Sequence, residues 1–241
     1  LGSRGLGDVY KRQLLGVTEF FRRDFLTDAR ALIPRPETEE LVEMVLKKIP
    51  DHPVRILDMG TGSGVIGVTL ALELKERAGE VVLADISPQA LDLALENAMR
   101  LGARVSTIQT DLFANIPPEK TGLLAGDADS APEGKKGEDG RNMLFDVIVA
   151  NLPYIAEGEK LAPEVMKDPH TALFGGPKGW EIIERFLSRA RDYLNEDGFV
   201  ALEIGYDQAS VVTQIMDGYG YNYIEVLKDI SGVARFPFGY R

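Results

Sequence analysis

The stretch Val54-Arg55-Ile56-Leu57-Asp58-Met59-Gly60-Thr61-Gly62-Ser63-Gly64 decides the fold of this 241-residue chain. Its first five residues form a short β-like run, and the segment 65–77 that follows is predicted to be a helix. The glycines at 60, 62 and 64 let the backbone turn sharply between the two and let a ligand lie against main-chain atoms. This order of strand, glycine-rich turn and helix is typical of α/β proteins that bind nucleotides.

Strands and helices alternate through the rest of the chain. The residue pattern predicts helices over 38–48, 88–101, 180–194 and 208–216, and further strands over 81–85, 105–109, 145–150, 199–204, 221–228 and 234–240. The run 145–150 is nearly all apolar, as expected of a strand buried on both faces. Pro237 favours an edge position or a bulge for the last strand. The alternation indicates a doubly wound, mostly parallel sheet.

Three segments stand outside this alternation. Residues 1–13 show no periodicity and are interpreted as an extension that is not part of the fold. Residues 14–36 hold two short extended pieces and the rigid Pro34-Arg35-Pro36, so they are predicted to form a hairpin-like linker ahead of a domain over 37–241. Residues 117–142 are polar and rich in glycine, which predicts a mobile insertion.

Composition limits the possible classes of function. The absence of cysteine excludes disulfides, thiolate zinc sites and a cysteine nucleophile, and two histidines leave little for a metal site or a Ser-His-Asp triad. No apolar run approaches the ~20 residues of a membrane helix, and no export leader opens the chain. We therefore expect a cytoplasmic protein without a metal or a membrane partner. The net charge of −11 disfavours direct binding of nucleic acid.

Three aspartates follow successive predicted strands, at the sheet edge where ligands of such folds bind. Asp58 can accept hydrogen bonds from loop amides or reach a cationic ligand, and Asp85 can receive both hydroxyls of a ribose. Asp111 is placed to meet an adenine edge, with Leu112 or Phe113 packing on the adenine face. The set predicts an adenosine-containing ligand.

Other nucleotide sites are less well matched by the glycine stretch. A P-loop is excluded, because no Gly-Lys-Ser/Thr follows. The dinucleotide pattern G-x-G-x-x-G can be forced onto Gly62, Gly64 and Gly67, so a nicotinamide enzyme stays open at this point.

The tetrapeptide Asn151-Leu152-Pro153-Tyr154 follows the predicted strand 145–150. The side-chain oxygen of Asn151 and the main-chain carbonyl of Leu152 can both accept hydrogen bonds from an NH2 group on a planar nitrogen. Pro153 stiffens the turn, and Tyr154 can pack on the planar group. The turn predicts a site that activates such a nitrogen by positioning and desolvation, without an obligatory general base.

These motifs together resemble the amino-methyltransferases of the class I fold, which use S-adenosylmethionine. The run Leu32-Ile33-Pro34-Arg35-Pro36-Glu37-Thr38-Glu39-Glu40-Leu41-Val42 narrows the resemblance to the HemK/PrmC family, which methylates a glutamine side-chain amide in peptide-chain release factors. The similarity extends from about Gln13 to the C-terminus, including 172–176 and 202–205.

The resemblance implies a Rossmann-like, seven-stranded fold, S-adenosylmethionine as cofactor, a release factor as partner and a monomer. It implies these cofactor-binding residues: Asp58, Gly60, Thr61, Gly62, Ser63, Gly64, Asp85, Ile86, Asp111, Leu112 and Asn151. It implies catalytic roles for Asn151, Leu152, Pro153 and Tyr154. Arg35 and Glu37 are expected at the pocket mouth, with an interdomain or helix-capping salt bridge as the other interpretation. His52 and His170 receive no role, and Trp180 is expected to pack in the core.

The sequence departs from the family pattern in three places. Leu152 stands where the family most often has proline, and because the carbonyl is unaffected, activity is expected to be kept. The helical domain that helps the family recognise the release factor is missing ahead of the hairpin, which implies a fragment with weakened substrate binding. The insertion over 117–142 lies outside the usual pattern.

Two further functions stay open. Asn-Leu-Pro-Tyr is also the form found in rRNA adenine dimethyltransferases, so N6-methylation of adenine in rRNA or DNA is the alternative reaction. The acidic charge and the run 33–42 disfavour it. A module that binds the cofactor without activity is the third interpretation.

Overall fold

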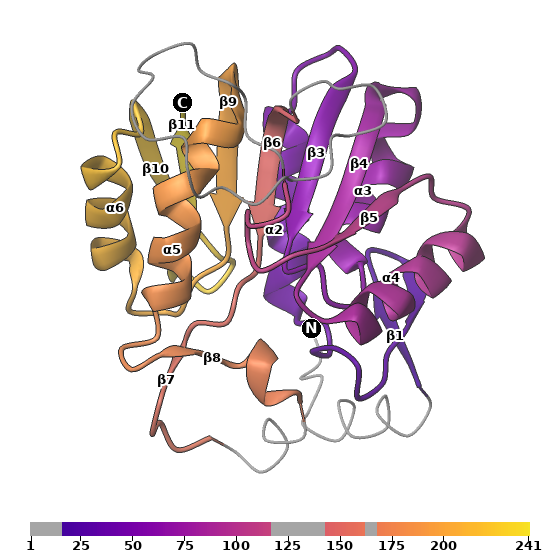
Figure 1. Ribbon diagram of the computed structural model, residues 1–241, viewed down its shortest axis with the longest axis horizontal. Helices are drawn as coiled ribbons and strands as arrows, with labels where there is room; N and C mark the ends of the chain where they lie inside the picture. Colours follow the sequence, from indigo (N-terminus) through magenta and orange to yellow (C-terminus); the bar gives the residue numbers. More distant parts are fainter. Residues whose placement is uncertain (1–15, 117–142, 162–167) are drawn as a thin grey trace, which may run out of the picture.

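A seven-stranded sheet forms the centre of the molecule in a computed structural model, which describes residues 16–116, 143–161 and 168–241 (Figure 1). The strand order is β10-β11-β9-β6-β3-β4-β5. Neighbouring strands are parallel except around β11, which is antiparallel to β9 and to β10. The strands are β3 (Val54–Met59), β4 (Ala78–Asp85), β5 (Ser106–Gln109), β6 (Phe145–Ala150), β9 (Leu194–Leu202), β10 (Tyr223–Lys228) and β11 (Ala234–Tyr240). This confirms the predicted doubly wound, mostly parallel sheet.

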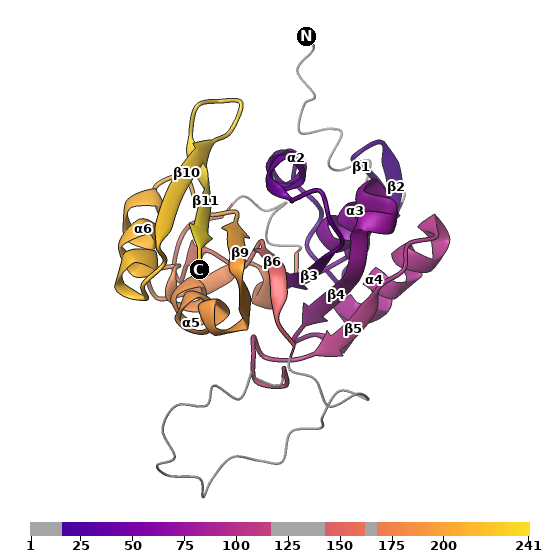
Figure 2. The ribbon, with the colours of Figure 1, turned by 90° about the horizontal axis from the view of Figure 1, so that it is seen from above.

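Helices cover both faces of the sheet (Figure 2). One core packs α2 (Pro36–Lys48), α3 (Val65–Leu74) and α4 (Pro88–Leu101) against one face. A second core packs α5 (Glu181–Ala190) and α6 (Ala209–Gly218) against the other. Successive residues of a strand point to opposite faces, so Ile56 belongs to the first core and Leu57 to the second. Short 3-10 turns lie at Lys75–Arg77, His170–Ala172 and Arg191–Tyr193.

An antiparallel hairpin precedes the sheet, as predicted. It consists of β1 (Val17–Phe20) and β2 (Arg23–Leu26). The buried Asn97 side chain of α4 accepts a hydrogen bond from the Leu26 amide and donates to the Leu26 and Ser63 carbonyls. Asn97 thereby ties the hairpin to the glycine-rich loop. The predictions for residues 1–13 and 117–142 lie outside the described residues.

The predicted ends of helices agree with the structure where capping residues mark them. Helix α4 begins after Ser87, whose hydroxyl accepts from the Ala90 amide, and ends at Gly102 with φ 75°. Strand β9 differs: it begins at Leu194 and not at 199. The polar residues 195–198 form an irregularity in its pairing with β6, between the Phe145 and Val147 positions. A bulge of this kind has no signal in a hydrophobic pattern.

The bulge expected near Pro237 is confirmed, whereas the prediction for Trp180 needs correction. Strand β11, which contains Pro237, lies between β10 and β9, so it is not an edge strand. Its pairing with β10 skips Arg235, which forms a bulge two residues before Pro237, and its ladder with β9 begins only at Phe238. Trp180 is not a core residue; it is half-buried at the N-terminus of α5, with the Lys178 ammonium 5.6 Å from its ring centroid.

A short parallel pair, β7 (Ile155–Ala156) and β8 (Phe174–Gly176), lies below the main sheet in Figure 1. It was not predicted from the sequence. Close backbone contacts hold it together: a Cβ on Gly175 would lie 2.3 Å from the Gly179 carbonyl oxygen and 2.5 Å from that of Pro153. The pair therefore packs tightly behind the turn that follows β6.

Candidate functional site

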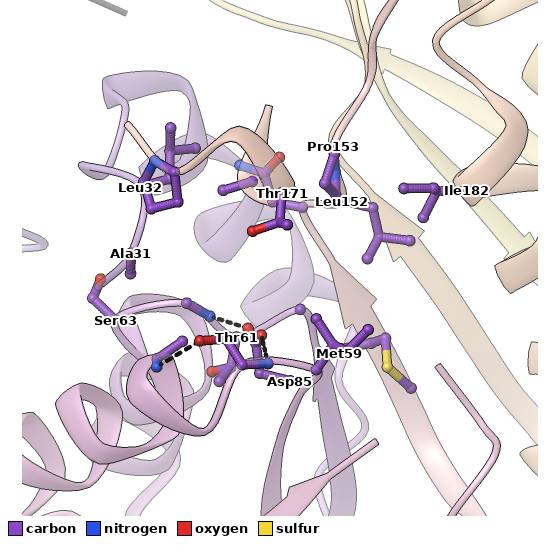
Figure 3. A pocket seen from close by; sticks show the side chains of 18 of the residues that line it. Ala31, Leu32, Met59, Thr61, Ser63, Asp85, Leu152, Pro153, Thr171 and Ile182 are labelled. Atoms are coloured by element: carbon purple, nitrogen blue, oxygen red, sulfur yellow. Dashed lines mark hydrogen bonds between the residues drawn. The ribbon is translucent and has the colours of Figure 1, made fainter. Parts of the chain in front are cut away.

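A cavity of about 730 Å³ lies at the carboxyl ends of β3, β4, β5 and β6. In Figure 3, Ala31 and Leu32 of the segment after the hairpin lie on one side, with Leu152 and Pro153 on the other. Residues 169–172 complete the lining. This volume is in the range of pockets that bind small molecules, so the cavity can hold a nucleoside-sized ligand together with part of a second molecule.

Most of the predicted site residues line this cavity: Arg35, Gly60, Thr61, Gly62, Ser63, Asp85, Ile86, Asp111, Leu112, Asn151, Leu152 and Pro153. Glu37, Asp58, Gly64 and Tyr154 are not among its lining residues.

The glycine-rich loop is fixed by main-chain contacts. The Gly60 and Thr61 amides donate to the Ala84 carbonyl at 2.8 and 3.0 Å, which ties the loop to the end of β4. Gly64 is the N-cap residue of α3, with φ 84°, and a Cβ there would lie 3.0 Å from the Ala94 Cβ. Glycine is needed at 64 for its conformation and for the close approach of α4.

Asp58 lies beneath this loop and is fully buried. Its Oδ2 accepts from the Thr61 hydroxyl at 2.6 Å and from the Gly67 amide at 2.9 Å. Burial raises the pKa of Asp58 to about 6, although both hydrogen bonds lower it. The position suits bracing of the loop from below.

Asp85 faces the cavity from the end of β4. Its Oδ2 accepts from the Gly62 amide and its Oδ1 from the Ser87 amide, both at 2.9 Å. Burial raises the pKa of Asp85, while these amides lower it. Each carboxylate oxygen keeps a second lone pair, so the pair can still receive two hydroxyls. Ile86, 58% exposed, offers an apolar surface beside them.

Asp111 and Leu112 form the cavity wall after β5. Leu112 adopts φ 49°, unusual for a leucine, and its carbonyl accepts from the Thr110 hydroxyl at 2.8 Å. The Asp111 carboxylate is paired with Arg185 of α5 at 2.9 Å. Phe113 points away and stacks on Tyr193, with 4.5 Å between ring centroids, so of the two candidates for an adenine face only Leu112 is available.

Asn151 follows β6 directly and is linked to two side chains that the sequence did not single out. The Thr38 hydroxyl of α2 accepts from the Asn151 Nδ2 at 3.2 Å and donates to Glu203 Oε2 at 2.7 Å. Thr38 and Glu203 are both buried. Burial raises the pKa of Glu203 to about 7. In the sequence, Thr38 and Glu203 belong to the family-like runs 32–42 and 202–205, but no role was predicted for either residue.

The rest of the tetrapeptide is held from behind. The Tyr154 carbonyl accepts from Gln208 Nε2 at 2.8 Å, and the Gln208 Oε1 accepts from the Gly205 amide at 2.9 Å. Burial raises the pKa of Tyr154 to about 12. Leu152 packs toward the glycine loop, where a Cβ on Gly60 would lie 2.9 Å from its Cδ2. The turn and the loop therefore form adjoining walls of one cavity.

An ion pair and a histidine that was assigned no role lie at another part of the cavity. Arg35 binds the buried carboxylate of Asp168 at 2.9 Å, and so Arg35 both lines the cavity and makes a salt bridge. His170 also lines the cavity, with its ring centroid 4.3 Å from that of Phe174. Glu37 lies outside the lining.

Comparison with known proteins places this chain in a class. A family model described as the methyltransferase small domain matches residues 37–124. A methyltransferase structure from Pyrococcus furiosus shares the fold, with 18% identity, a TM-score of 0.60, and coverage of 97% of this chain and 94% of that chain. The chain has the fold of an S-adenosylmethionine-dependent methyltransferase, and S-adenosylmethionine is its cofactor.

Sequence relatives narrow the class to one family. The release factor glutamine methyltransferase of Koribacter versatilis is 39% identical over 94% of this chain and 72% of that protein. The protein of the same name from Neisseria gonorrhoeae is 36% identical over 99% of this chain and 79% of that protein. The chain belongs to the release factor glutamine methyltransferase family.

Proposed function

We propose that this chain transfers a methyl group from S-adenosylmethionine to the side-chain amide nitrogen of a glutamine in a peptide-chain release factor. The observation that carries the proposal is the adjoining position of the 151–154 turn and the glycine loop in one cavity. The family membership supports the same reaction and the same substrate.

The donor set fits the proposed cofactor. Asp85 suits a ribose, the glycine loop leaves room beside its main chain, and Ile86 and Leu112 offer apolar surfaces for a planar base. Asp58 and Gly64 act from beneath, by fixing the loop. S-adenosylmethionine, when bound, supplies the methyl group on a positively charged sulfur.

The residues of the turn hold the acceptor nitrogen. A glutamine amide nitrogen is a weak nucleophile because its lone pair is delocalised into the carbonyl. Asn151 Oδ1 and the Leu152 carbonyl each accept one hydrogen from the amide NH2, which fixes the nitrogen toward the methyl group. Pro153 limits the freedom of the turn. The proton can leave to solvent after transfer, so no general base is needed.

Composition and family membership both bear on the partners and the compartment of the enzyme. No helix within the described part of the chain is long and apolar enough to cross a membrane. The net charge of −11 supports a protein substrate over a nucleic-acid one. We infer that the chain works in the cytoplasm, as a monomer, through a domain that begins near 37 behind the hairpin.

A methyl-transfer assay with labelled S-adenosylmethionine tests the proposal. Purified release factor, rRNA and duplex DNA are offered in parallel, and peptide mass spectrometry locates any methyl group. The expected result is methylation of one glutamine in the release factor. Transfer to RNA or DNA alone overturns the proposal in favour of adenine methylation, and tight cofactor binding with no transfer favours a binding module.

A further inference from the structure

The side chain of Asn151 has two possible orientations, and only one serves the proposed reaction. An asparagine amide has an acceptor, Oδ1, and a donor, the Nδ2 group. An acceptor nitrogen that carries two hydrogens can bind Oδ1 but is repelled by Nδ2. A rotation of the amide by half a turn would therefore remove the grip on the substrate while leaving the shape of the site unchanged.

Thr38, which lines the cavity beside Asn151, and the buried Glu203 decide this orientation by the polarity of their hydrogen bonds. An ionised Glu203 carboxylate can only accept, so the single hydroxyl proton of Thr38 goes to Glu203, at 2.7 Å. The Thr38 oxygen is then left as an acceptor, and only the Nδ2 of Asn151 can bind it, at 3.2 Å. The Asn151 Oδ1 is thereby directed away from Thr38.

The backbone places the three residues together. Glu203 directly follows β9, and its amide donates to the Ala150 carbonyl at 3.1 Å, next to Asn151. Thr38 lies in the first turn of α2, above this edge of the sheet. Thr38 and Glu203 are 2% and 1% exposed, so water does not compete for their hydrogen bonds.

We propose that Thr38 and Glu203 are positioning residues that hold the Asn151 amide with Oδ1 toward the acceptor nitrogen. The inference rests on the proposed methyl transfer to an amide. It explains why the Asn151 side chain takes the one orientation that can bind the acceptor nitrogen. It also explains why a buried carboxylate is kept next to the site, where its desolvation is unfavourable.

Protonation of Glu203 interrupts this polarity. Burial raises its pKa to about 7, and the charge of Glu37 on α2 raises it further, whereas Thr38, Asn151 and Arg235 of β11 lower it. A protonated Glu203 can itself donate to Thr38, which frees the hydroxyl proton to turn toward Asn151. The chain of hydrogen bonds from Glu203 through Thr38 to Asn151, called the relay below, then no longer specifies one orientation of the Asn151 amide. We therefore expect kcat to fall as the pH drops through 7.

Substitutions that keep size and change polarity test the relay. Thr38→Val removes the hydroxyl and Glu203→Gln removes the obligatory acceptor, while Thr38→Ser restores the hydroxyl. Thr69→Val is the matched control, since Thr69 is a buried threonine whose hydroxyl has no hydrogen-bond partner among the described residues. For each variant, kcat for release factor is measured across pH together with the Kd for S-adenosylmethionine.

We expect Thr38→Val to lower kcat by about tenfold or more with little change in the cofactor Kd. Thr38→Ser recovers most of the loss, and Thr69→Val behaves as the unaltered chain. Glu203→Gln lowers kcat and flattens its rise with pH near 7. A normal kcat in Thr38→Val, or an unaltered pH profile in Glu203→Gln, overturns the relay.

A measurement without an acceptor separates failure of the relay from failure of the proposed function. The Asn151 side-chain NH2 signal is assigned in a proton–nitrogen NMR spectrum by its loss in Asn151→Asp. Its hydrogen exchange with solvent is then compared between the unaltered chain and Thr38→Val. Exchange that speeds up about tenfold or more supports the relay even if release factor is not the substrate. Equal exchange rates refute it whatever the substrate is.

Discussion

The two halves of the cavity are built in different ways. The cofactor half is made largely by the main chain: two carboxylates, Asp58 and Asp85, accept hydrogen bonds from two glycine amides and the Thr61 hydroxyl, between residues 3, 9 and 23 positions apart. The acceptor half is made by side chains from distant segments, with Asn151 and Thr38 113 positions apart and Thr38 and Glu203 165 apart. A local motif thus defines one half, and only the tertiary fold assembles the other.

The difference suits the two tasks. The backbone conformation of the glycine loop fixes the position of each main-chain amide donor. Fixed donors suit a cofactor, because its shape is the same in every reaction cycle. An acceptor grip needs one amide in one orientation, and that depends on the polarity of its neighbours. We therefore expect changes in the acceptor half to alter kcat with little effect on cofactor affinity, and changes in the cofactor half to alter the Kd for the cofactor.

Removal of the acceptor grip is the largest expected effect. Asn151→Ala deletes the oxygen that binds the amide NH2, so we predict a kcat lower by about 100- to 1,000-fold. The cofactor half is built by other residues, so its Kd for S-adenosylmethionine, measured by calorimetry, should change far less than kcat. Asn195→Ala is the control, because its amide binds Asp146 and does not line the cavity. A rate near normal in Asn151→Ala would refute the role of Asn151.

The same comparison explains how far the sequence could be read. The glycine stretch, Asp85 and the alternating strands are local patterns, so the sheet and the cofactor half were predictable from them. Thr38 looked like an ordinary helix residue and Glu203 like a strand-end carboxylate. Their contact depends on α2 crossing the sheet at β9, which no local pattern encodes. Of the two roles predicted for Asp58, the structure favours the acceptor of hydrogen bonds beneath the loop, because its carboxylate is fully buried.

Glu203 should also make the free energy of unfolding depend on pH. Its pKa of about 7 in the folded chain lies above the value of ~4.3 expected for an unfolded glutamate. The folded state therefore binds the proton more tightly, and the contribution of this group to stability is full below about pH 4.3 and is lost as the pH rises through 7.

Glu203→Gln removes this loss because its amide stays neutral. We predict that the variant gains stability relative to the unaltered chain between pH 4.5 and 8, by roughly 2–3 kcal/mol in urea unfolding. Glu43→Gln, on the exposed face of α2, should show no such gain. A stability difference that is the same at both ends of this pH range contradicts a raised pKa in the folded state.

A single added methyl group at Gly64 should disturb the cofactor half of the cavity. Gly64→Ala places a Cβ 3.0 Å from Ala94 Cβ and 3.1 Å from Ala94 Cα at a φ of 84°. We predict a loss of about 1–3 kcal/mol in unfolding free energy and a higher Kd for S-adenosylmethionine, with kcat at saturating cofactor much less affected. Gly102→Ala, at φ 75° with no atom within 4 Å, reproduces the backbone strain without the crowding. Equal effects of the two variants would mean that strain, and not contact with α4, requires the glycine.

The smallest effect is expected at the exposed side chain of α5 that reaches the cofactor half. Arg185 pairs with Asp111 at 2.9 Å, but their side chains are 58% and 50% exposed, so the pair contributes little to stability. We predict that Arg185→Ala changes the unfolding free energy by less than ~1 kcal/mol. It should also change the cofactor Kd less than Asp111→Ala does, because the free Asp111 carboxylate can then accept from the adenine amine. Arg189→Ala, one turn along α5 and away from the cavity, controls for charge. If Arg185→Ala weakens binding more than Asp111→Ala, the arginine itself contacts the cofactor, and this half of the cavity also depends on a side chain supplied by a distant segment.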